Sequence, residues 1–249
     1  SLENRFGQKK LNQKADGWIV RSQEHLQRLQ TQIGVAREDI AMIPGSIDTD
    51  LFRPCAEEAR TQARAKFKIP ADAQVIGHAA LMAGRGQEEL IEAATLVDNP
   101  KLHLLFIGRG EDEAKVKARA AASSISDRIH FTGYLQGDAL LEGYAAMDGA
   151  FSAQAGNDAS VRAVLEAMSC GLPVVGVSDG AIGEAIKPDV GFGVASRTPQ
   201  DIASGLQAFL NRSEEMGHNA RKKMEIERSM SLEAQRTISY YEIRLKLKN

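Results

Sequence analysis

The chain has 249 residues, of which 43% are hydrophobic and 26% charged, and this composition excludes a disordered, collagen-like or coiled-coil protein. Lys and Arg number 31 against 33 Asp and Glu, so the net charge is −2. A nucleic-acid-binding domain is usually strongly basic, and we therefore expect no nucleic-acid partner.

The first 70 residues predict a small α/β segment. A polar helix extends to Lys14, and a strand at residues 17–20, a helix at 23–32 and an extended run at 40–44 follow it. The chain starts at Ser1 without an initiator Met, so we interpret it as a fragment of a longer protein.

From residue 73 onward, short apolar runs alternate with helical patterns, which is typical of parallel strands joined by crossover helices. The expected strands lie at residues 75–80, 102–107, 129–131, 149–153, 173–177 and 193–194, and the expected helices at 88–97, 112–122, 140–146, 161–169, 182–186 and 199–210. The strands are almost entirely apolar, as when helices cover both faces of a sheet. The predicted fold class is α/β, a Rossmann-like parallel sheet, followed at 213–248 by a charged helical tail that packs outside it.

Disulfides, metal sites and membrane spans are not expected. Cys55 and Cys170 are far apart in sequence and near no histidine cluster, which fits a reducing compartment. Asp48 and Asp50 mimic an Asp-x-Asp metal motif, but the prolines on either side favour a turn. The longest apolar runs are shorter than the roughly 18–20 residues of a membrane span, and the chain carries no secretory signal.

Ligands of an open parallel sheet bind beyond the carboxyl ends of its strands, so the loops there are the candidate sites. In the first, Gly84 and Gly86 flank Arg85, an arrangement in which backbone and guanidinium can hold a phosphate. A flexible surface turn with a solvated Arg explains this loop equally well. His78, at the end of the preceding strand, is expected to pack in the core or at its rim.

The second loop, Gly108-Arg109-Gly110, begins like a dinucleotide-binding fingerprint. Glu113 stands in place of the third glycine, and His130 lies where the acidic residue is expected, so the fingerprint fails. A simple strand-to-helix turn is the alternative.

The third loop carries two acidic residues, Asp158 before the helix and Glu166 two turns into it. Carboxylates accept hydrogen bonds from paired hydroxyls, so one can bind a sugar and the other a ribose. Alternatively, Asp158 or Ser160 caps the helix and Glu166 merely pairs with Arg162. Glu166 is the only charge in residues 163–170, a run suited to burial, and this favours function. A fourth loop at 178–184 predicts either an anion site or a plain turn.

Together these segments resemble the C-terminal, donor-binding half of retaining glycosyltransferases of the GT-B architecture, in the large family-four group. The sequence Leu-Glu-Ala-Met-Ser-Cys-Gly-Leu-Pro-Val-Val at residues 165–175 is the most specific match. Other matching blocks lie at 15–22, 43–48, 52–54, 130–134 and 180–184. The resemblance implies that residues 1–44 are the end of an N-terminal domain and linker, 45–212 the nucleotide-sugar-binding domain and 213–249 a helical tail.

The resemblance also implies residue roles. Glu166 would bind the ribose, Asp158 would lie near the donor sugar, and Arg85 would replace a diphosphate-binding Lys. The remaining nucleotide-binding positions are Ser160, Val161 and Arg162 at the helix start, Gly133, Tyr134 and Leu135 near the base, and Gly108 and Gly110. Ala80 departs from the family, because many members carry a second phosphate-binding Arg there. The form of residues 158–163 resembles a subgroup associated with bacterial surface polysaccharide or lipopolysaccharide assembly.

The implied reaction is retaining, metal-independent transfer of a hexose-type sugar from a UDP-, GDP- or ADP-sugar to a glycan or lipid-linked acceptor, with no cofactor. Arg85 and the helix start at Val161 would stabilise the leaving diphosphate. The acceptor site belongs to the missing N-terminal domain, so we expect this chain alone to transfer no sugar. The implied location is cytoplasmic, with peripheral contact at the inner membrane face through the full-length protein.

Two other hypotheses remain open. A noncatalytic nucleotide-binding or assembly module with a degenerate donor site is favoured by Ala80. An NAD-dependent oxidoreductase domain is disfavoured by Glu113 in the broken glycine pattern.

Overall fold

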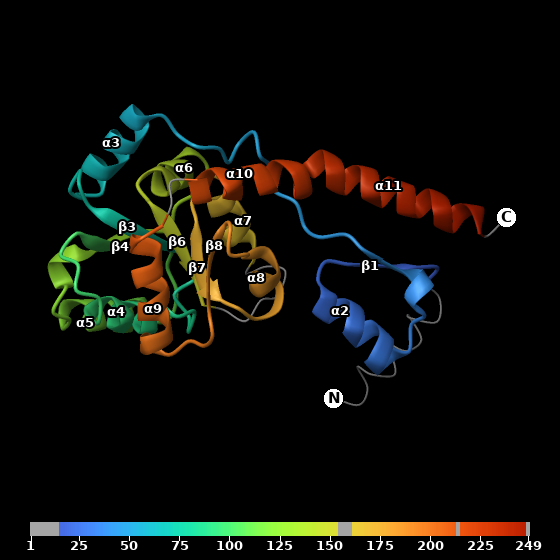
Figure 1. Cartoon of the computed structure of the whole chain (residues 1–249), viewed down its shortest axis with the longest axis horizontal. Helices are drawn as coiled ribbons and strands as arrows, with labels where there is room; N and C mark the ends of the chain where they lie inside the picture. The colour runs from blue at the N-terminus through green and yellow to red at the C-terminus, as the bar shows by residue number, and fades with distance from the viewer. Residues whose placement is uncertain (1–14, 154–160, 213–214, 248–249) are drawn as a thin grey trace. The chain divides into compact units, whose positions relative to one another are not determined.

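The computed structural model describes residues 15–153, 161–212 and 215–247. The chain divides into two compact units, which we describe separately (Figure 1). Unit 1 combines Ser1–Ser46 with Arg228–Asn249, and unit 2 is the continuous segment Ile47–Glu227. The predicted polar helix up to Lys14 lies outside the described residues.

Unit 2 is built on one parallel sheet, which confirms the predicted fold class. Its strands, in the spatial order β5-β4-β3-β6-β7-β8, are β3 (Gln74–Ala79), β4 (Leu102–Ile107), β5 (Ile129–Gly133), β6 (Gly149–Ser152), β7 (Val174–Val177) and β8 (Gly191–Val194). Every neighbouring pair is parallel. All six predicted strands are present, because continuous apolar runs are what a strand covered on both faces requires.

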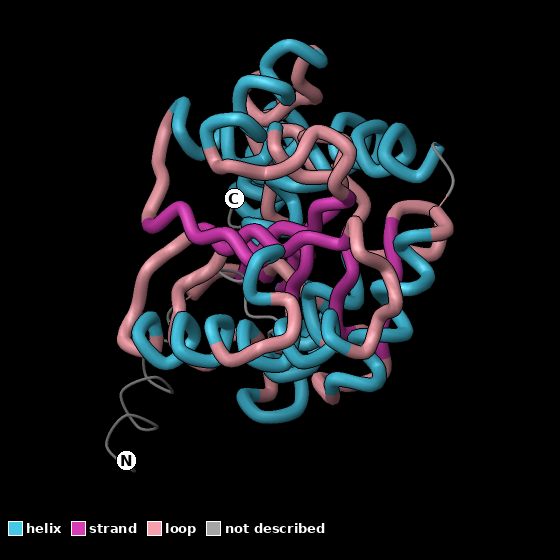
Figure 2. The backbone as a smooth tube through the Cα atoms, turned by 90° about the vertical axis from the view of Figure 1, so that its left-hand side faces the viewer, coloured by secondary structure: helices cyan, strands magenta, loops and turns pink. Residues whose placement is uncertain are grey.

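Helices cover both faces of this sheet (Figure 2). Leu105 and Ile107 of β4 point into one core, and Leu104 and Phe106 point into the other. Buried residues of α3 (Glu57–Lys66), α6 (Asp138–Ala145), α7 (Val161–Ser169), α8 (Gly180–Ala185) and α10 (Glu215–Glu227) complete the first core. The second core contains residues of α4 (Gln87–Thr95), α5 (Glu113–Ala121) and α9 (Pro199–Leu210).

Helix α3 is absent from the sequence prediction. Its ten residues carry charges throughout and bury only Ala63 and Arg64, so they show no apolar period. The tail predicted at 213–248 consists of two helices. The first of them, α10, packs on α7 and buries Ala220 and Met224 in the first core.

Unit 1 contains a two-stranded parallel sheet of β1 (Trp18–Val20) and β2 (Ile40–Met42). Between them, the predicted helix at 23–32 is α2 (Gln23–Arg28), which continues as a π-helical turn (Leu29–Ile33), and a 3-10 turn (Arg37–Asp39) leads into β2. The C-terminal helix α11 (Met230–Lys246) belongs to this unit. The Tyr240 hydroxyl accepts a hydrogen bond from the backbone N–H of Trp18 (2.9 Å) and donates one to the carbonyl of Asp39 (2.6 Å).

The junction of β3 with β6 is short, since only Ile76 with Gly149 and Gly77 with Ala150 are in register. Asp148 extends it at the amino end, where its Oδ2 accepts from the backbone N–H of Val75 (2.7 Å). At the carboxyl end, the Nδ1 of His78 donates to the carbonyl of Phe151 (2.9 Å). Side chains therefore supply part of the bonding that the backbone ladder of these two strands lacks.

Asp148 is also the counter-ion of a buried arginine. Arg64 is buried, and its Nη2 lies 2.7 Å from Asp148 Oδ2. The remaining Arg64 donors bond to the carbonyls of Ala71, Ala73 and Ala146, and Arg60 binds the other oxygen of Asp148.

In the described part of the chain, no helix combines the length and apolar character that crossing a membrane requires.

We expect Asp148→Asn to lower the free energy of unfolding by about 3–5 kcal/mol, because it leaves the buried Arg64 guanidinium without a counter-ion. Urea denaturation at pH 7 measures this loss. Glu142→Gln is the matched control, since Glu142 pairs with Lys66 at an exposed site and such pairs contribute about 0–1 kcal/mol. Equal losses in the two variants would contradict the structural role of Asp148.

Candidate functional site

The order of strands in the sheet identifies the place where a ligand is expected. From β3 the chain proceeds outward through β4 and β5, and then returns to the other side of β3 to form β6, β7 and β8. At such a reversal, the connections leave neighbouring strands in opposite directions and open a crevice beyond their carboxyl ends. The loop of residues 80–86 follows β3, and α7 follows β6. These two segments therefore adjoin the position where a crevice is expected.

Three side chains hold the loop of residues 80–86. The buried Gln87 amide donates to the carbonyl of Leu81 (3.0 Å) and accepts from the backbone N–H of Arg85 (3.1 Å). Gly84 donates its N–H to Asp112 (2.8 Å) and accepts from Arg197 (3.1 Å). These bonds connect the loop to residues before or in α4, α5 and α9.

Arg85 is half-buried within this loop. Its backbone is bonded to Gln87, but its guanidinium forms no hydrogen bond or ion pair with a residue that the structure describes. An arginine held in place through its backbone, with its planar donor group unused, is suited to bind an anion.

His78 lies at the end of β3, and burial lowers the pKa of its imidazole, so the ring is neutral. Its Nδ1 hydrogen-bonds the carbonyl of Phe151, and its Nε2 has no partner in the described part of the chain. The ring also contacts Phe106 and Phe151 edge-on. This is the core packing that the sequence analysis expects.

Glu166 is 6% exposed in the middle of α7, which confirms the burial expected from its apolar neighbours. Its Oε2 accepts a hydrogen bond from the Tyr144 hydroxyl (2.7 Å), and its Oε1 accepts one from the Nε of Arg162 (2.9 Å). The pairing with Arg162 was one of the alternatives open at the sequence level. Both oxygens of the carboxylate have a donor, yet each retains a further lone pair for a hydroxyl group.

Tyr144 was missed by the sequence reasoning. It lies on α6, 22 residues from Glu166, and its ring is buried edge-on against Phe52. Burial, and next the Glu166 charge, hold the pKa of the Tyr144 hydroxyl well above its usual range, so it stays protonated and donates. The sequence feature that could have identified it is a single tyrosine within a mostly apolar helix.

The glycines after β4 have a structural explanation. A side chain at Gly108 would overlap the carbonyl of Ala80, and one at Gly110 would overlap that of Met82. The turn after β4 therefore packs tightly against the loop that carries Arg85. The guanidinium of Arg109 lies against Gly133, next to Tyr134, which is 66% exposed. Leu135 is half-buried beside it. The predicted positions after β4 and β5 are thus neighbours.

Other predicted positions lie elsewhere or outside the described residues. Asp158 and Ser160 belong to the segment 154–160, which the structure does not describe. Val161 is the buried first residue of α7. In the fourth loop, Asp179 caps α8 through the N–H of Gly180 (2.8 Å). The turn predicted at Asp48 is confirmed, since its Oδ1 accepts from the N–H groups of Asp50 (3.1 Å) and Leu51 (3.0 Å).

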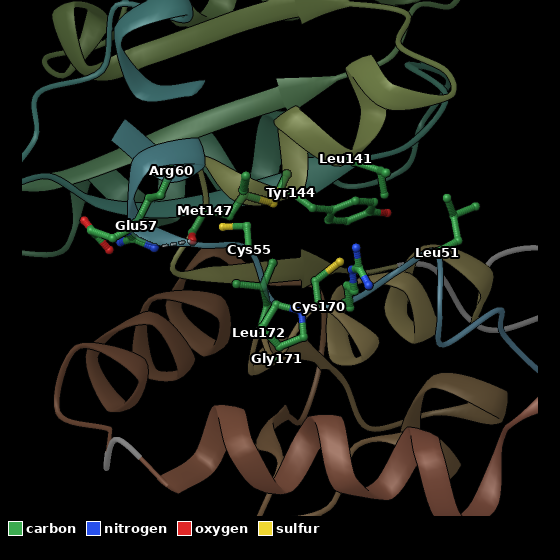
Figure 3. Close-up of a pocket in the computed structure, with 13 residues that line it drawn as sticks. Leu51, Cys55, Glu57, Arg60, Leu141, Tyr144, Met147, Cys170, Gly171 and Leu172 are labelled. Carbon is green, nitrogen blue, oxygen red and sulfur yellow. Dashed lines mark hydrogen bonds between the residues drawn. The ribbon is translucent and has the colours of Figure 1, made fainter. Parts of the chain in front are cut away.

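A cavity of about 340 Å³ lies beside the amino ends of β6 and β7 (Figure 3). Met147, just before β6, and Leu172, just before β7, line it together with both cysteines and the ring of Tyr144. Burial, with the Glu166 charge second, raises the pKa of the Cys170 thiol to about 12. Burial also raises the pKa of Cys55. Both thiols are therefore protonated at neutral pH and are poor nucleophiles.

Within the described ranges, the segments that follow β3 and β6 carry a guanidinium without a partner, that of Arg85, and a buried carboxylate, that of Glu166. No three His, Cys, Asp or Glu side chains of those ranges come together as metal ligands. The arrangement can bind a ligand that has an anionic group and hydroxyl groups.

The amino-acid sequence matches a known protein family and is similar to a named mannosyltransferase. The family model described as "Glycosyl transferases group 1" matches residues 59–225. The chain is 26% identical over 241 residues to the GDP-mannose-dependent monoacylated alpha-(1-6)-phosphatidylinositol monomannoside mannosyltransferase of Corynebacterium glutamicum, and the match covers 92% of this chain but 62% of that protein.

Solved structures share the fold. A glycosyltransferase from Rickettsia africae superposes with a TM-score of 0.85 at 19% identity, over 96% of this chain and 67% of that one. Alr3699/HepE of Anabaena, in complex with UDP-glucose, gives a TM-score of 0.79 at 20% identity, over 92% of this chain and 64% of that one.

We expect Tyr144→Phe to lower the free energy of unfolding by about 1.5–3 kcal/mol, since it removes a hydrogen bond to a buried charged group. Chemical denaturation followed by circular dichroism measures the difference. Tyr134→Phe is the control, because Tyr134 is exposed and its substitution should change stability by less than about 0.5 kcal/mol. Wild-type stability of Tyr144→Phe would show that Glu166 does not depend on the hydroxyl.

Proposed function

The chain belongs to the glycosyl transferases group 1 family, and we propose that it forms the donor-binding half of a retaining glycosyltransferase. The observation that carries the proposal is the pair of groups after β3 and β6: the guanidinium of Arg85, which has no partner among the described residues, and the buried carboxylate of Glu166. A nucleoside diphosphate sugar offers matching groups, an anionic diphosphate and the two hydroxyls of its ribose.

In the proposed complex, the ribose hydroxyls donate to Glu166, and the diphosphate lies between Arg85 and the amino end of α7. The base lies beside Gly133 and Tyr134, and Asp158 is near the donor sugar. Cleavage of the bond between the anomeric carbon and the diphosphate develops negative charge on the leaving oxygen. Fixed donors at that oxygen lower the barrier most, so we assign this role to Arg85 and the first N–H groups of α7.

As the family resemblance implies, we propose a front-face displacement that retains the anomeric configuration and uses neither metal nor other cofactor. The relatives support more than one donor, since the Corynebacterium protein is named for GDP-mannose and the Anabaena structure contains UDP-glucose. We propose a UDP-, GDP- or ADP-sugar as donor and a glycan or lipid-linked acceptor.

The chain spans 62% of the length of the Corynebacterium mannosyltransferase. A complete enzyme with transferase activity would therefore need a further domain. We propose that an N-terminal acceptor-binding domain completes the enzyme. The wider role would be bacterial surface polysaccharide or lipopolysaccharide synthesis, in the cytoplasm and at the inner face of the membrane.

A noncatalytic module with a degenerate donor site is the second candidate. Ala80 favours it, because this position contributes a backbone N–H to Ile107 and no cation to the crevice. An NAD-dependent oxidoreductase has less support, since the glycine turn after β4 is explained by its packing against the Arg85 loop.

Titration calorimetry with UDP, GDP, ADP and NAD tests the donor site. We expect one nucleoside diphosphate to bind, and Arg85→Ala and Glu166→Gln each to weaken it about tenfold or more, the effect of losing a hydrogen bond to a charged group. Arg119→Ala, which breaks an exposed pair with Glu92 on another surface, should leave binding unchanged. Binding of NAD would favour the oxidoreductase, and no binding by any nucleotide would favour the module.

We expect the chain alone to transfer no sugar, because the proposed acceptor site lies outside it. Incubation with UDP-, GDP- and ADP-hexoses and simple glycan or lipid acceptors, followed by mass spectrometry of the products, measures this. Release of a glycosylated product would contradict the assignment of the acceptor site to another domain.

A further inference from the structure

The ion pair of Arg162 with Glu166 joins two side chains of different exposure. The Arg162 side chain is 74% exposed, whereas the carboxylate it contacts is almost completely buried. Tyr144, which holds the other oxygen of Glu166, is also buried. Of the two donors, Tyr144 is therefore fixed by its packing, and Arg162 is free to turn toward solvent.

The stability of the helix does not explain this pair. Arg162 is the second residue of α7, and a positive charge in the first turn is opposed by the helix dipole. The order is also the less favourable of the two, because an i, i+4 pair stabilises a helix more when the acidic residue comes first. A cation at this position is favourable when an anion lies at the helix start, where the first N–H groups have no partner within the helix.

We propose that Arg162 changes partner when a nucleotide binds. In the unliganded chain its guanidinium neutralises the buried Glu166 carboxylate. In the complex, the ribose hydroxyls donate to Glu166 in its place, and the guanidinium turns to the diphosphate at the start of α7. The proposal rests on the donor site described above and adds a second phosphate-binding cation to it, supplied by α7 rather than by the loop after β3.

The exchange is balanced in charge and in hydrogen bonds. Glu166 loses one charged donor and gains hydroxyl donors, while its bond from Tyr144 stays in place. Arg162 leaves one carboxylate oxygen and meets phosphate oxygens, which accept from its fork of N–H groups with good geometry. A nucleoside without phosphate provides only half of this exchange, because it displaces Arg162 without offering it an anion.

The test compares two ligands on one set of variants. The nucleoside diphosphate that binds best and its parent nucleoside are titrated, by calorimetry and by ligand-observed NMR respectively. For Arg162→Gln we expect the diphosphate affinity to fall about tenfold or more, and the nucleoside affinity to stay the same or rise. Arg162→Lys should recover part of the diphosphate affinity, because it restores the charge.

The other possible titration results lead to different conclusions about the two proposals. If Arg162→Gln weakens nucleoside and diphosphate by the same factor, Arg162 only supports Glu166 and the proposal is wrong. If Arg162→Gln leaves the diphosphate affinity unchanged while Arg85→Ala and Glu166→Gln reduce it, the donor site stands without Arg162. If the wild-type chain binds no nucleoside diphosphate, both proposals fail. Arg119→Gln controls for loss of a surface arginine, and circular dichroism checks that each variant is folded.

Discussion

The parallel contact of β3 with β6 is the constraint on which unit 2 depends. All the other strands extend outward from these two, yet their ladder has only two residue pairs in register, whereas β3 and β4 are paired from Gln74 to Ala79. Side chains strengthen the junction at both ends, Asp148 at the amino end and His78 at the carboxyl end. The Arg85 loop follows one of these two strands and α7 follows the other, so the junction also connects the two segments that carry the candidate site.

The two sides of the crevice differ in how they are built. The Arg85 loop is hydrogen-bonded to Gln87, Asp112 and Arg197 and packs on the glycine turn after β4. On the α7 side, a buried donor, Tyr144, and an exposed one, Arg162, meet at Glu166. Hydrogen bonds that fix a loop beforehand reduce the entropy that binding must overcome, while an exposed arginine provides a counter-ion for the buried Glu166 carboxylate. In the proposed donor site, the first of these segments would contact the diphosphate and the second the ribose hydroxyls.

The sequence predicts the sheet well because each strand is an apolar run bounded by turn residues, and the buried Glu166 stands out in such a run. It fails where contacts between distant elements decide the outcome. Helix α3 has too few apolar residues for a periodic pattern and is anchored instead through Arg64 and Asp148. The bond from Tyr144 to Glu166 arises only when α6 and α7 fold against the same face of the sheet. The hydrogen bonds of Gly84 with Asp112 and Arg197 likewise depend on tertiary structure. The roles of Asp158 and Ser160 remain predictions.

Unit 1 is formed by two segments on either side of unit 2 in the sequence, and this affects the order of folding. Tyr240 bonds to Trp18 and Asp39, which precede it by 222 and 201 residues. Unit 2 is continuous in sequence and lies wholly between these partners. During synthesis on the ribosome, all of unit 2 emerges before α11 does, so it can form its core while β1 and β2 still lack their helix. Folding of unit 2 then draws the two ends of the intervening segment together and shortens the loop that α11 has to close, which lowers the entropic cost of closure.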